Sequence, residues 1–253
     1  MLRTRIIPAL LLYNESLVKT HRFGNFDYVG DPCNTVRIFN ELEVDELLFL
    51  DISAPRTGHA PNIELLANIA NECFMPLGYG GGVKTVDQAS SIYDVGFEKV
   101  ALNSSLIDHP ELLTQIANRN GSQAVIASID IKSGLFNRNT VKTHGGKKSV
   151  NKSPVSFAKE LEDRGAGEIL LTSIDREGTW SGFDYHITKE ICDEVSIPVI
   201  AHGGAGSLLD IRKVVKECGA SAVALGSMIV YQKKGMGVLV NFPDHKQLEV
   251  TLK

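Results

Sequence analysis

The chain has 253 residues, of which 43% are hydrophobic and 22% are charged, and its formal net charge is −4. This is ordinary globular composition, at a length close to that of one parallel α/β barrel. The small negative charge argues against a nucleic-acid partner, and no apolar run approaches the roughly 18 residues that span a bilayer. The first residues do not resemble a secretory leader, and the four cysteines are scattered without a CxxC pair. We therefore expect a cytoplasmic protein with no metal site and no cofactor.

Short apolar runs alternate with segments of helical periodicity along the whole chain. The runs are almost continuously hydrophobic, as strands covered on both faces must be. They comprise residues 5–12, 46–52, 75–79, 99–102, 124–130, 168–172, 198–201 and 222–225. Between them, helices are predicted over residues 61–73, from Ser153-Pro154 onward, over 208–218 and over 244–252. Eight strands alternating with helices favour one (β/α)8 TIM barrel over residues 1–253, and not an open doubly wound sheet.

The two halves of the chain resemble each other in three blocks. Residues 46–50 match 168–172, residues 76–82 match 198–204, and residues 102–104 match 225–227. Glycine-rich turns recur in barrels for geometric reasons, but the equal spacing of about 122 residues favours two duplicated half-barrels. Two segments are irregular: residues 13–31 exceed a usual connection and predict a functional lid, and the polar residues 132–152 predict a small hairpin or a mobile loop.

Glycine-rich turns follow the third and the seventh predicted strand, at residues 80–82 and 203–206. Because glycine has no Cβ atom, backbone N–H groups there can surround an anion. The next strand ends in Asn103-Ser104 in the first half and in Gly226-Ser227 in the second. A lone glycine turn is usually only a tight turn, whereas two related copies favour two phosphate sites and a ligand that is long or carries more than one phosphate.

Polar residues at strand ends are candidates for proton transfer or substrate binding. Asp130 ends the fifth predicted strand, at the face where TIM barrels hold their catalytic groups. It serves there as a general acid or base, or else it caps a turn or pairs with Lys132. His202 directly precedes the second glycine turn. Asp51 ends the second strand and either binds substrate or orients a neighbour, while Lys19, in the long first loop, is as easily a solvated lysine.

Four charged residues of alternating sign lie near the starts of predicted strands, at the bottom of the barrel. From residue type and position alone, a ring of salt bridges that closes the barrel is the simplest interpretation. The residues are Arg5, Glu46, Lys99 and Glu168.

Several of these segments together resemble the HisF family, the cyclase subunit of imidazole glycerol phosphate synthase. The resemblance covers residues 1 to about 231 and is carried by residues 5–7, 30–32, 45–51, 80–82, 121–125, 165–175 and 203–206. It implies that Asp130 is one of two catalytic aspartates. It also implies that the charged ring is a gate for ammonia from a HisH-like glutaminase. The implied phosphate sites are Gly82, Asn103 and Ser104, and Gly178, Gly204, Gly226 and Ser227, with further substrate contacts from Lys19, Asp51 and Glu177.

Three residues depart from the HisF pattern. Leu11 stands where the second catalytic aspartate is expected, and leucine cannot exchange a proton. His202 replaces a serine, which makes it a candidate second proton carrier, and Glu177 replaces an aspartate.

Other segments resemble the WbuZ type of HisF-like proteins, namely residues 5–12, 28–32, 44–47, 72–76 and 237–243. That branch is associated with sugar amidation for bacterial surface polysaccharides. It implies a barrel that works beside a HisH-like glutaminase and a separate sugar amidotransferase, and that supports conversion of an acetamido to an acetamidino group on a phosphorylated or nucleotide-linked sugar.

Two further interpretations stay open. One is a true imidazole glycerol phosphate synthase subunit of histidine biosynthesis, which turns PRFAR and ammonia into imidazole glycerol phosphate and AICAR. Both phosphate sites favour it and Leu11 opposes it. The other is a non-catalytic ammonia conduit and scaffold, which is considered because Leu11 stands where a catalytic aspartate is expected.

Overall fold

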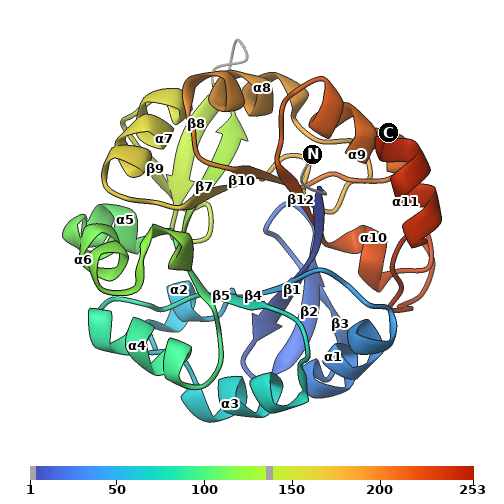
Figure 1. The fold of residues 1–253 in the computed structure, drawn as a ribbon, viewed down its shortest axis with the longest axis horizontal. Coiled ribbons are helices and arrows are strands. Elements are labelled where there is room, and N and C mark those ends of the chain that lie inside the picture. Colours follow the sequence, from blue (N-terminus) through green and yellow to red (C-terminus); the bar gives the residue numbers. More distant parts are fainter. Residues whose placement is uncertain (1–3, 135–138) are drawn as a thin grey trace.

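The computed structural model describes residues 4–134 and 139–253. Eight parallel strands form a closed barrel (Figure 1), because β12 pairs with β1 and β7 pairs with β10. No edge of the barrel sheet is therefore left unpaired, and the predicted (β/α)8 barrel is confirmed. The strands are β1 (Arg5–Tyr13), β4 (Leu47–Asp51), β5 (Leu77–Gly80), β6 (Lys99–Leu102), β7 (Val125–Ser133), β10 (Glu168–Ser173), β11 (Val199–His202) and β12 (Ala222–Leu225).

Helices form the outer ring of the molecule and follow the strands in sequence (Figure 1). Several begin at a polar residue whose side chain accepts a backbone N–H of the first turn, including Asn62 before α3 and Ser153 before α7. In the described part of the chain, no helix is both long and apolar enough to cross a bilayer. The helices are α1 (Pro32–Glu41), α2 (Ala54–Thr57), α3 (Ile63–Glu72), α4 (Val86–Asp94), α5 (Ser105–Asp108), α6 (Glu111–Asn120), the 3-10 helix η1 (Ser122–Ala124), α7 (Pro154–Asp163), α8 (Tyr185–Glu194), α9 (Leu208–Lys216), α10 (Ser227–Val230) and α11 (His245–Leu252).

Two apolar clusters follow from the alternation of side chains along each strand. The larger cluster lies between the strands and the helices and includes Leu10 and Leu12 of β1. A smaller cluster includes the alternate residues Ile7 and Ala9 and fills the inside of the barrel. The members of the inner cluster are Ile7, Ala9, Leu48, Ala101, Ile126, Leu170, Ile200, Ala222 and Ala224, several of them small.

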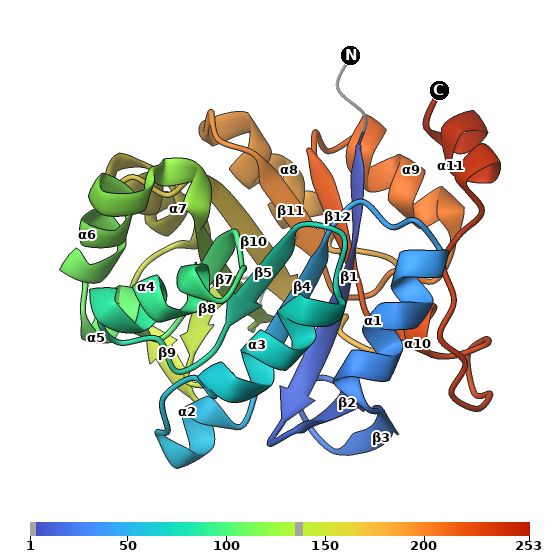
Figure 2. The ribbon, with the colours of Figure 1, turned by 60° about the horizontal axis from the view of Figure 1, so that its bottom comes forward.

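Two antiparallel hairpins extend the barrel at the carboxyl ends of its strands (Figure 2). The first is β2 (Ser16–Thr20) and β3 (Phe26–Gly30), which pairs with β1. The lid expected over residues 13–31 is thus largely a sheet extension, because Leu17 and Val18 are buried against β1. The second is β8 (Asn139–Thr143) and β9 (Lys148–Val150), on β7. It confirms the hairpin predicted over residues 132–152, of which 135–138 lie outside the described residues.

The two hairpins start from equivalent strands, since β1 and β7 each have nine residues and each begins one half of the barrel. The registers show the same relationship. Leu11 of β1 lies beside Leu50 of β4, and Asp130 of β7 lies beside Thr172 of β10. Leu11 therefore occupies the place in the first half that Asp130 occupies in the second.

Candidate functional site

A cavity of about 360 Å³ opens at the carboxyl ends of the barrel strands. It brings together most of the residues that the sequence singled out. Gly178, Gly204 and Ser227 instead line a small adjoining cavity that shares Lys19, Glu177, His202 and Gly226 with the large one. The predicted residues around the large cavity are Leu11, Lys19, Asp51, Gly82, Asn103, Ser104, Asp130, Glu177, His202 and Gly226.

Asp130 is buried in the wall of the large cavity. Burial raises the pKa of its carboxyl group to about 7, although hydrogen bonds from Asn103 and Thr172 act in the opposite direction. The Asn103 amide donates to Oδ2 of Asp130 over 3.2 Å. A carboxyl group with such a pKa exists in both forms near neutral pH, as a general acid or base requires.

His202 is also buried, and burial lowers the pKa of its imidazole to about 4; Glu177 raises that pKa and Lys19 lowers it further. The ring is therefore neutral near pH 7. Its Nδ1 lies 3.1 Å from Oγ1 of Thr172. An imidazole in this state can accept a proton.

Thr172 links these two groups, and sequence reasoning missed it. In the barrel register it lies beside Asp130 on one side and beside His202 on the other, where neighbouring strands are roughly 4.8 Å apart. A hydroxyl group can donate to one partner while it accepts from the other. The only local signal was its position in the inward-facing row of Glu168, Leu170 and Thr172.

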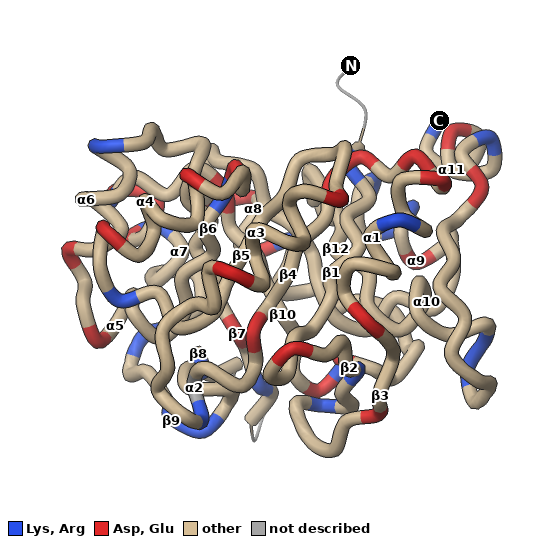
Figure 3. The backbone as a smooth tube through the Cα atoms, turned by 90° about the horizontal axis from the view of Figure 1, so that it is seen from below, with Lys and Arg blue, Asp and Glu red and all other residues tan. Residues whose placement is uncertain are grey.

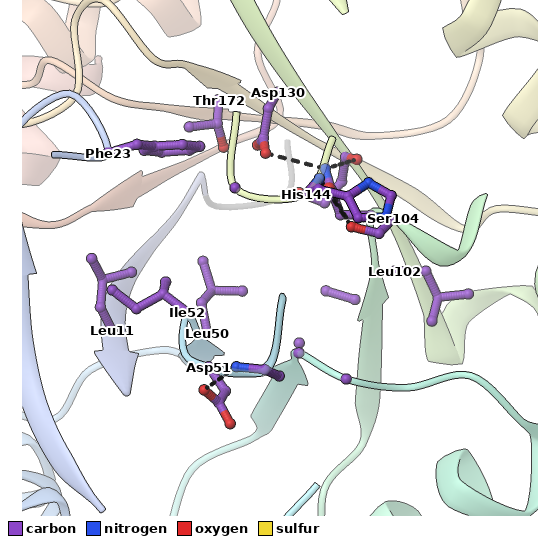
Figure 4. A pocket seen from close by; sticks show the side chains of 18 of the residues that line it. Leu11, Phe23, Leu50, Asp51, Ile52, Leu102, Ser104, Asp130, His144 and Thr172 are labelled. Carbon is purple, nitrogen blue, oxygen red and sulfur yellow. Dashed lines mark hydrogen bonds between the residues drawn. The ribbon is translucent and has the colours of Figure 1, made fainter. Parts of the chain in front are cut away.

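The opposite side of the cavity is apolar. Leu11, Leu50 and Ile52 gather there, away from Asp130 and Thr172 (Figure 4). In the register, Leu50 and Gly80 occupy the places that Thr172 and His202 occupy in the second half. Leucine at position 11 is therefore one member of an apolar wall.

Lys19 is not a solvated loop lysine, contrary to one interpretation of the sequence. Its side chain is only 6% exposed and forms an ion pair with Glu177, whose side chain is 3% exposed. Lys19 also donates to the carbonyl oxygen of Thr20 over 2.7 Å, and Glu177 accepts from the backbone N–H of Phe23 over 3.2 Å. The pair ties the β2–β3 hairpin to the loop after β10.

The carboxylate of Asp51 forms hydrogen bonds with residues that follow it closely in the sequence. Its Oδ1 accepts hydrogen bonds from the backbone N–H and the hydroxyl of Ser53, at 2.8 and 2.6 Å, and from the N–H of Ala54 at 3.2 Å. Its Oδ2 lies 3.7 Å from Nε2 of His59. Of the two roles considered for Asp51, these contacts favour orientation of the segment that leads into α2.

The four charged residues at the strand starts form the expected ring. Arg5 lies 2.7 Å from Glu46 and 2.8 Å from Glu168, while Lys99 lies 2.9 Å from Glu46 and 3.3 Å from Glu168. Each cation thus bridges both carboxylates. The ring is at the amino ends of the strands, and the cavity is at their carboxyl ends.

Close packing explains the glycines of both turns. Gly82 has φ +69°, and a Cβ atom there would lie 2.6 Å from the carbonyl oxygen of His59. At Gly204, with φ +105°, a Cβ atom would lie 2.2 Å from the carbonyl oxygen of Gly182. Among the described residues, no group of three or more His, Cys, Asp or Glu side chains could hold a metal ion.

A closed (β/α)8 barrel with polar, partly titratable residues at the carboxyl ends of its strands defines a protein of the TIM-barrel enzyme class. Comparison with known proteins narrows this class. Residues 5–235 match the family model described as "Histidine biosynthesis protein".

Three curated relatives match almost the whole chain. The "Putative imidazole glycerol phosphate synthase subunit hisF2" of Pseudomonas aeruginosa is 46% identical over 250 residues, which cover 99% of this chain and 100% of that relative. The "Putative imidazole glycerol phosphate synthase subunit HisF" of Leptospira borgpetersenii is 47% identical over 245 residues, 96% of each chain. The "Imidazole glycerol phosphate synthase subunit HisF" of Hyphomonas neptunium is 42% identical over 228 residues, 90% of each. The chain therefore belongs to the HisF family of histidine biosynthesis proteins, a class of enzyme subunits.

Proposed function

We propose that this protein is a HisF-like synthase subunit that receives ammonia from a HisH-like glutaminase. It supports conversion of an acetamido to an acetamidino group on a phosphorylated or nucleotide-linked sugar for surface polysaccharide. The observation that carries this proposal is the one-sided site. Asp130, Thr172 and His202 form a polar line on three adjacent strands, and the equivalent places of the first half are apolar.

The side chains that point into the barrel are consistent with a route for ammonia along the barrel axis. In β1, the row runs from Arg5 in the charged ring past Ile7 and Ala9 to Leu11 in the cavity wall. The inner cluster between the two ends is apolar, so it offers no ligand that would retain a small neutral molecule. In this proposal, the ring of Arg5, Glu46, Lys99 and Glu168 is the gate.

Amidination replaces a carbonyl oxygen by nitrogen, so ammonia must lose protons while the departing oxygen gains them. Asp130 supplies a proton in its acid form and takes one up in its ionised form, because its pKa lies near 7. Neutral His202 is the second acceptor, connected to Asp130 through the hydroxyl of Thr172. The glutaminase and a separate sugar amidotransferase would be the two partners.

Imidazole glycerol phosphate synthase itself is the second candidate, favoured by the names of the relatives. This candidate requires a mechanism that works with leucine at position 11. The loss of one acid/base group usually lowers the reaction rate by a factor of about 10² or more. The third candidate is a non-catalytic conduit and scaffold.

The purified chain should first be given PRFAR with excess ammonium salt, while PRFAR absorbance is followed. We expect no turnover by a folded sample; robust turnover, or rescue of a histidine auxotroph that lacks HisF, would establish the histidine pathway instead. The Asp130→Asn variant should then be combined with the glutaminase, the sugar amidotransferase and an acetamido sugar. Loss of the amidino product supports a catalytic barrel, and an unchanged yield supports the conduit.

A further inference from the structure

A second cavity, of about 520 Å³, lies outside the barrel between the carboxyl ends of β1, β4 and β5 and the start of α3. It shares only Asp51 with the large cavity, so it is separate from the acid/base groups of the proposed function. Its volume is within the range of about 300–1,000 Å³ that is typical of small-molecule sites. We propose that this second cavity binds an organic cation, namely an ammonium or guanidinium group on an alkyl stem.

The floor of the second cavity is apolar. Leu12 and Leu66 are each only 1% exposed and belong to the core between the strands and the helices, and Leu65 packs against that core. The buried ring of Tyr79 completes the floor, and its hydroxyl group is bonded to Asp51. An alkyl group in the cavity would therefore replace water over an apolar surface, which favours binding.

The mouth of the second cavity is polar and negatively charged. Glu15 and Asp51 contribute carboxylates to the lining, and within the described part of the chain no lysine or arginine lines it. One negative charge remains even if the imidazole of His59 is protonated. Figure 3 shows an acidic segment beside β2, on the side toward α2. The mouth residues are Asn14, Glu15, Ser16, His59, Ala60 and Asn62.

The carboxylate of Glu15 is available to a ligand. Its side chain is exposed, and it forms no ion pair with a described residue. Its Oε1 accepts one hydrogen bond, from the amide of Asn62 over 3.3 Å, which leaves most of its acceptor capacity unused. An ammonium or guanidinium group can donate charge-assisted hydrogen bonds to it. A neutral ligand would instead remove water from the carboxylate without replacing its charge partner.

The amino end of α3 lies at the same cavity and has a partial positive charge. The side chain of Asn62 already accepts the backbone N–H of Leu65, over 3.1 Å, and Glu64 places a carboxylate in the same first turn. This helix end is therefore capped and its charge is compensated, so it does not turn the cavity into an anion site.

Hydrogen bonds hold the mouth in place before a ligand binds. The hydroxyl of Ser53 accepts from the backbone N–H of Asn14 over 3.3 Å and donates to Asp51 over 2.6 Å. Nε2 of His59 lies 3.1 Å from this hydroxyl, and Nδ1 lies 2.8 Å from the carbonyl oxygen of Ala60. The turn after β1 and the segment after β4 are thus connected, and a ligand needs little rearrangement to enter.

NMR titration of the full chain with n-butylammonium tests the proposal. We expect binding at a ratio of 1:1 that shifts the signals of the His59 ring and the Asn62 amide. Butyrate, n-butanol and the ammonium ion reverse the charge, remove the charge and remove the stem, and each should bind at least tenfold more weakly. N-acetyl-lysine methylamide distinguishes the two sources of such a cation: tighter binding than n-butylammonium indicates a lysine side chain of a partner protein, and weaker binding indicates a free amine.

Variants locate the charged group. Glu15→Gln should weaken binding of n-butylammonium at least fivefold, whereas Glu111→Gln, which removes an exposed carboxylate on α6, should leave it unchanged. The inference is overturned if butyrate binds as tightly as n-butylammonium, if no probe shifts the His59 and Asn62 signals, or if Glu15→Gln has no effect. Asp130→Asn should not alter this binding, so the result is independent of whether sugar amidination is observed.

Discussion

The side chains of Asp130 and His202 share one hydrogen-bonding partner, the hydroxyl group of Thr172. Their strands place them at the same height in the barrel, so the contact depends on register and not on sequence proximity. Burial moves the two pKa values in opposite directions, to about 7 for Asp130 and to about 4 for His202. Acid/base sites typically have environments that shift the pKa values of neighbouring groups in opposite directions.

The Asp130→Asn variant should change the pH dependence of stability. The pKa of Asp130 is raised on folding, so its contribution to the free energy of unfolding is present below about pH 4 and is lost as the pH rises to about 7. The unaltered chain should therefore lose stability over this range relative to the variant. Urea unfolding at pH 5 and pH 8 measures the difference, and parallel pH profiles of the two proteins would contradict it.

The His202→Gln variant should instead change how stability is lost at acidic pH. The pKa of His202 is lowered on folding, so its contribution is present above about pH 6.5 and is lost as the pH falls toward 4. The variant should lose less stability than the unaltered chain between pH 6.5 and pH 4. The same unfolding series, extended to pH 4.5, checks this, and an equal acid loss in both proteins would show that folding does not lower the pKa of His202.

Thr172→Val should disconnect Asp130 from His202 without changing the side-chain volume much. Because the hydroxyl group lowers the pKa of Asp130, its removal should shift that pKa upward from about 7. Amidino product formation should fall about tenfold, as expected for the loss of a hydrogen bond to a charged group. Carbon NMR titration of the Asp130 carboxyl group reports the shift, and Thr172→Ser, which keeps the hydroxyl, should restore both properties. An unmoved titration in Thr172→Val would refute the link.

Leu11→Asp should cost about 2 kcal/mol of unfolding free energy, because the new carboxyl group would be buried beside Leu50 in the apolar wall. The loss should be larger at pH 8 than at pH 5, since only the ionised form bears a charge. Leu11→Asn is the matched uncharged control and should lack this pH dependence. If Leu11→Asp also gained PRFAR turnover, the missing carboxyl group at position 11 would be what prevents the histidine-pathway reaction in this chain.

Lys99→Met should destabilise the barrel by roughly 3 kcal/mol, because Glu46 and Glu168 would keep only Arg5 as a partner in a largely buried ring. Lys159→Met is the control: it removes an exposed, solvent-screened ion pair with Glu194 and should leave the free energy of unfolding nearly unchanged. Thermal unfolding of both variants provides the comparison, and equal losses would mean that the ring contributes no more than a surface pair.

The charged ring could be predicted from sequence because a charge at the start of an apolar strand stands out, as at Glu46 and Glu168. The strands were also predictable, since hydrophobicity is a local property. Thr172 could not be predicted, because threonine is common in strands and its role depends on which residues of other strands lie beside it. The burial of Lys19 was missed for a similar reason, since it depends on a hairpin partner and on Glu177, far away in the chain.

The hairpins on β1 and β7 stand outside the eight-stranded barrel, although they border its cavity. Changes in their length or sequence can therefore alter which molecules enter without disturbing the pairing that closes the barrel. The barrel can in this way stay the same while only the hairpins at its rim change. Relatives with the same architecture then differ in the compounds they accept.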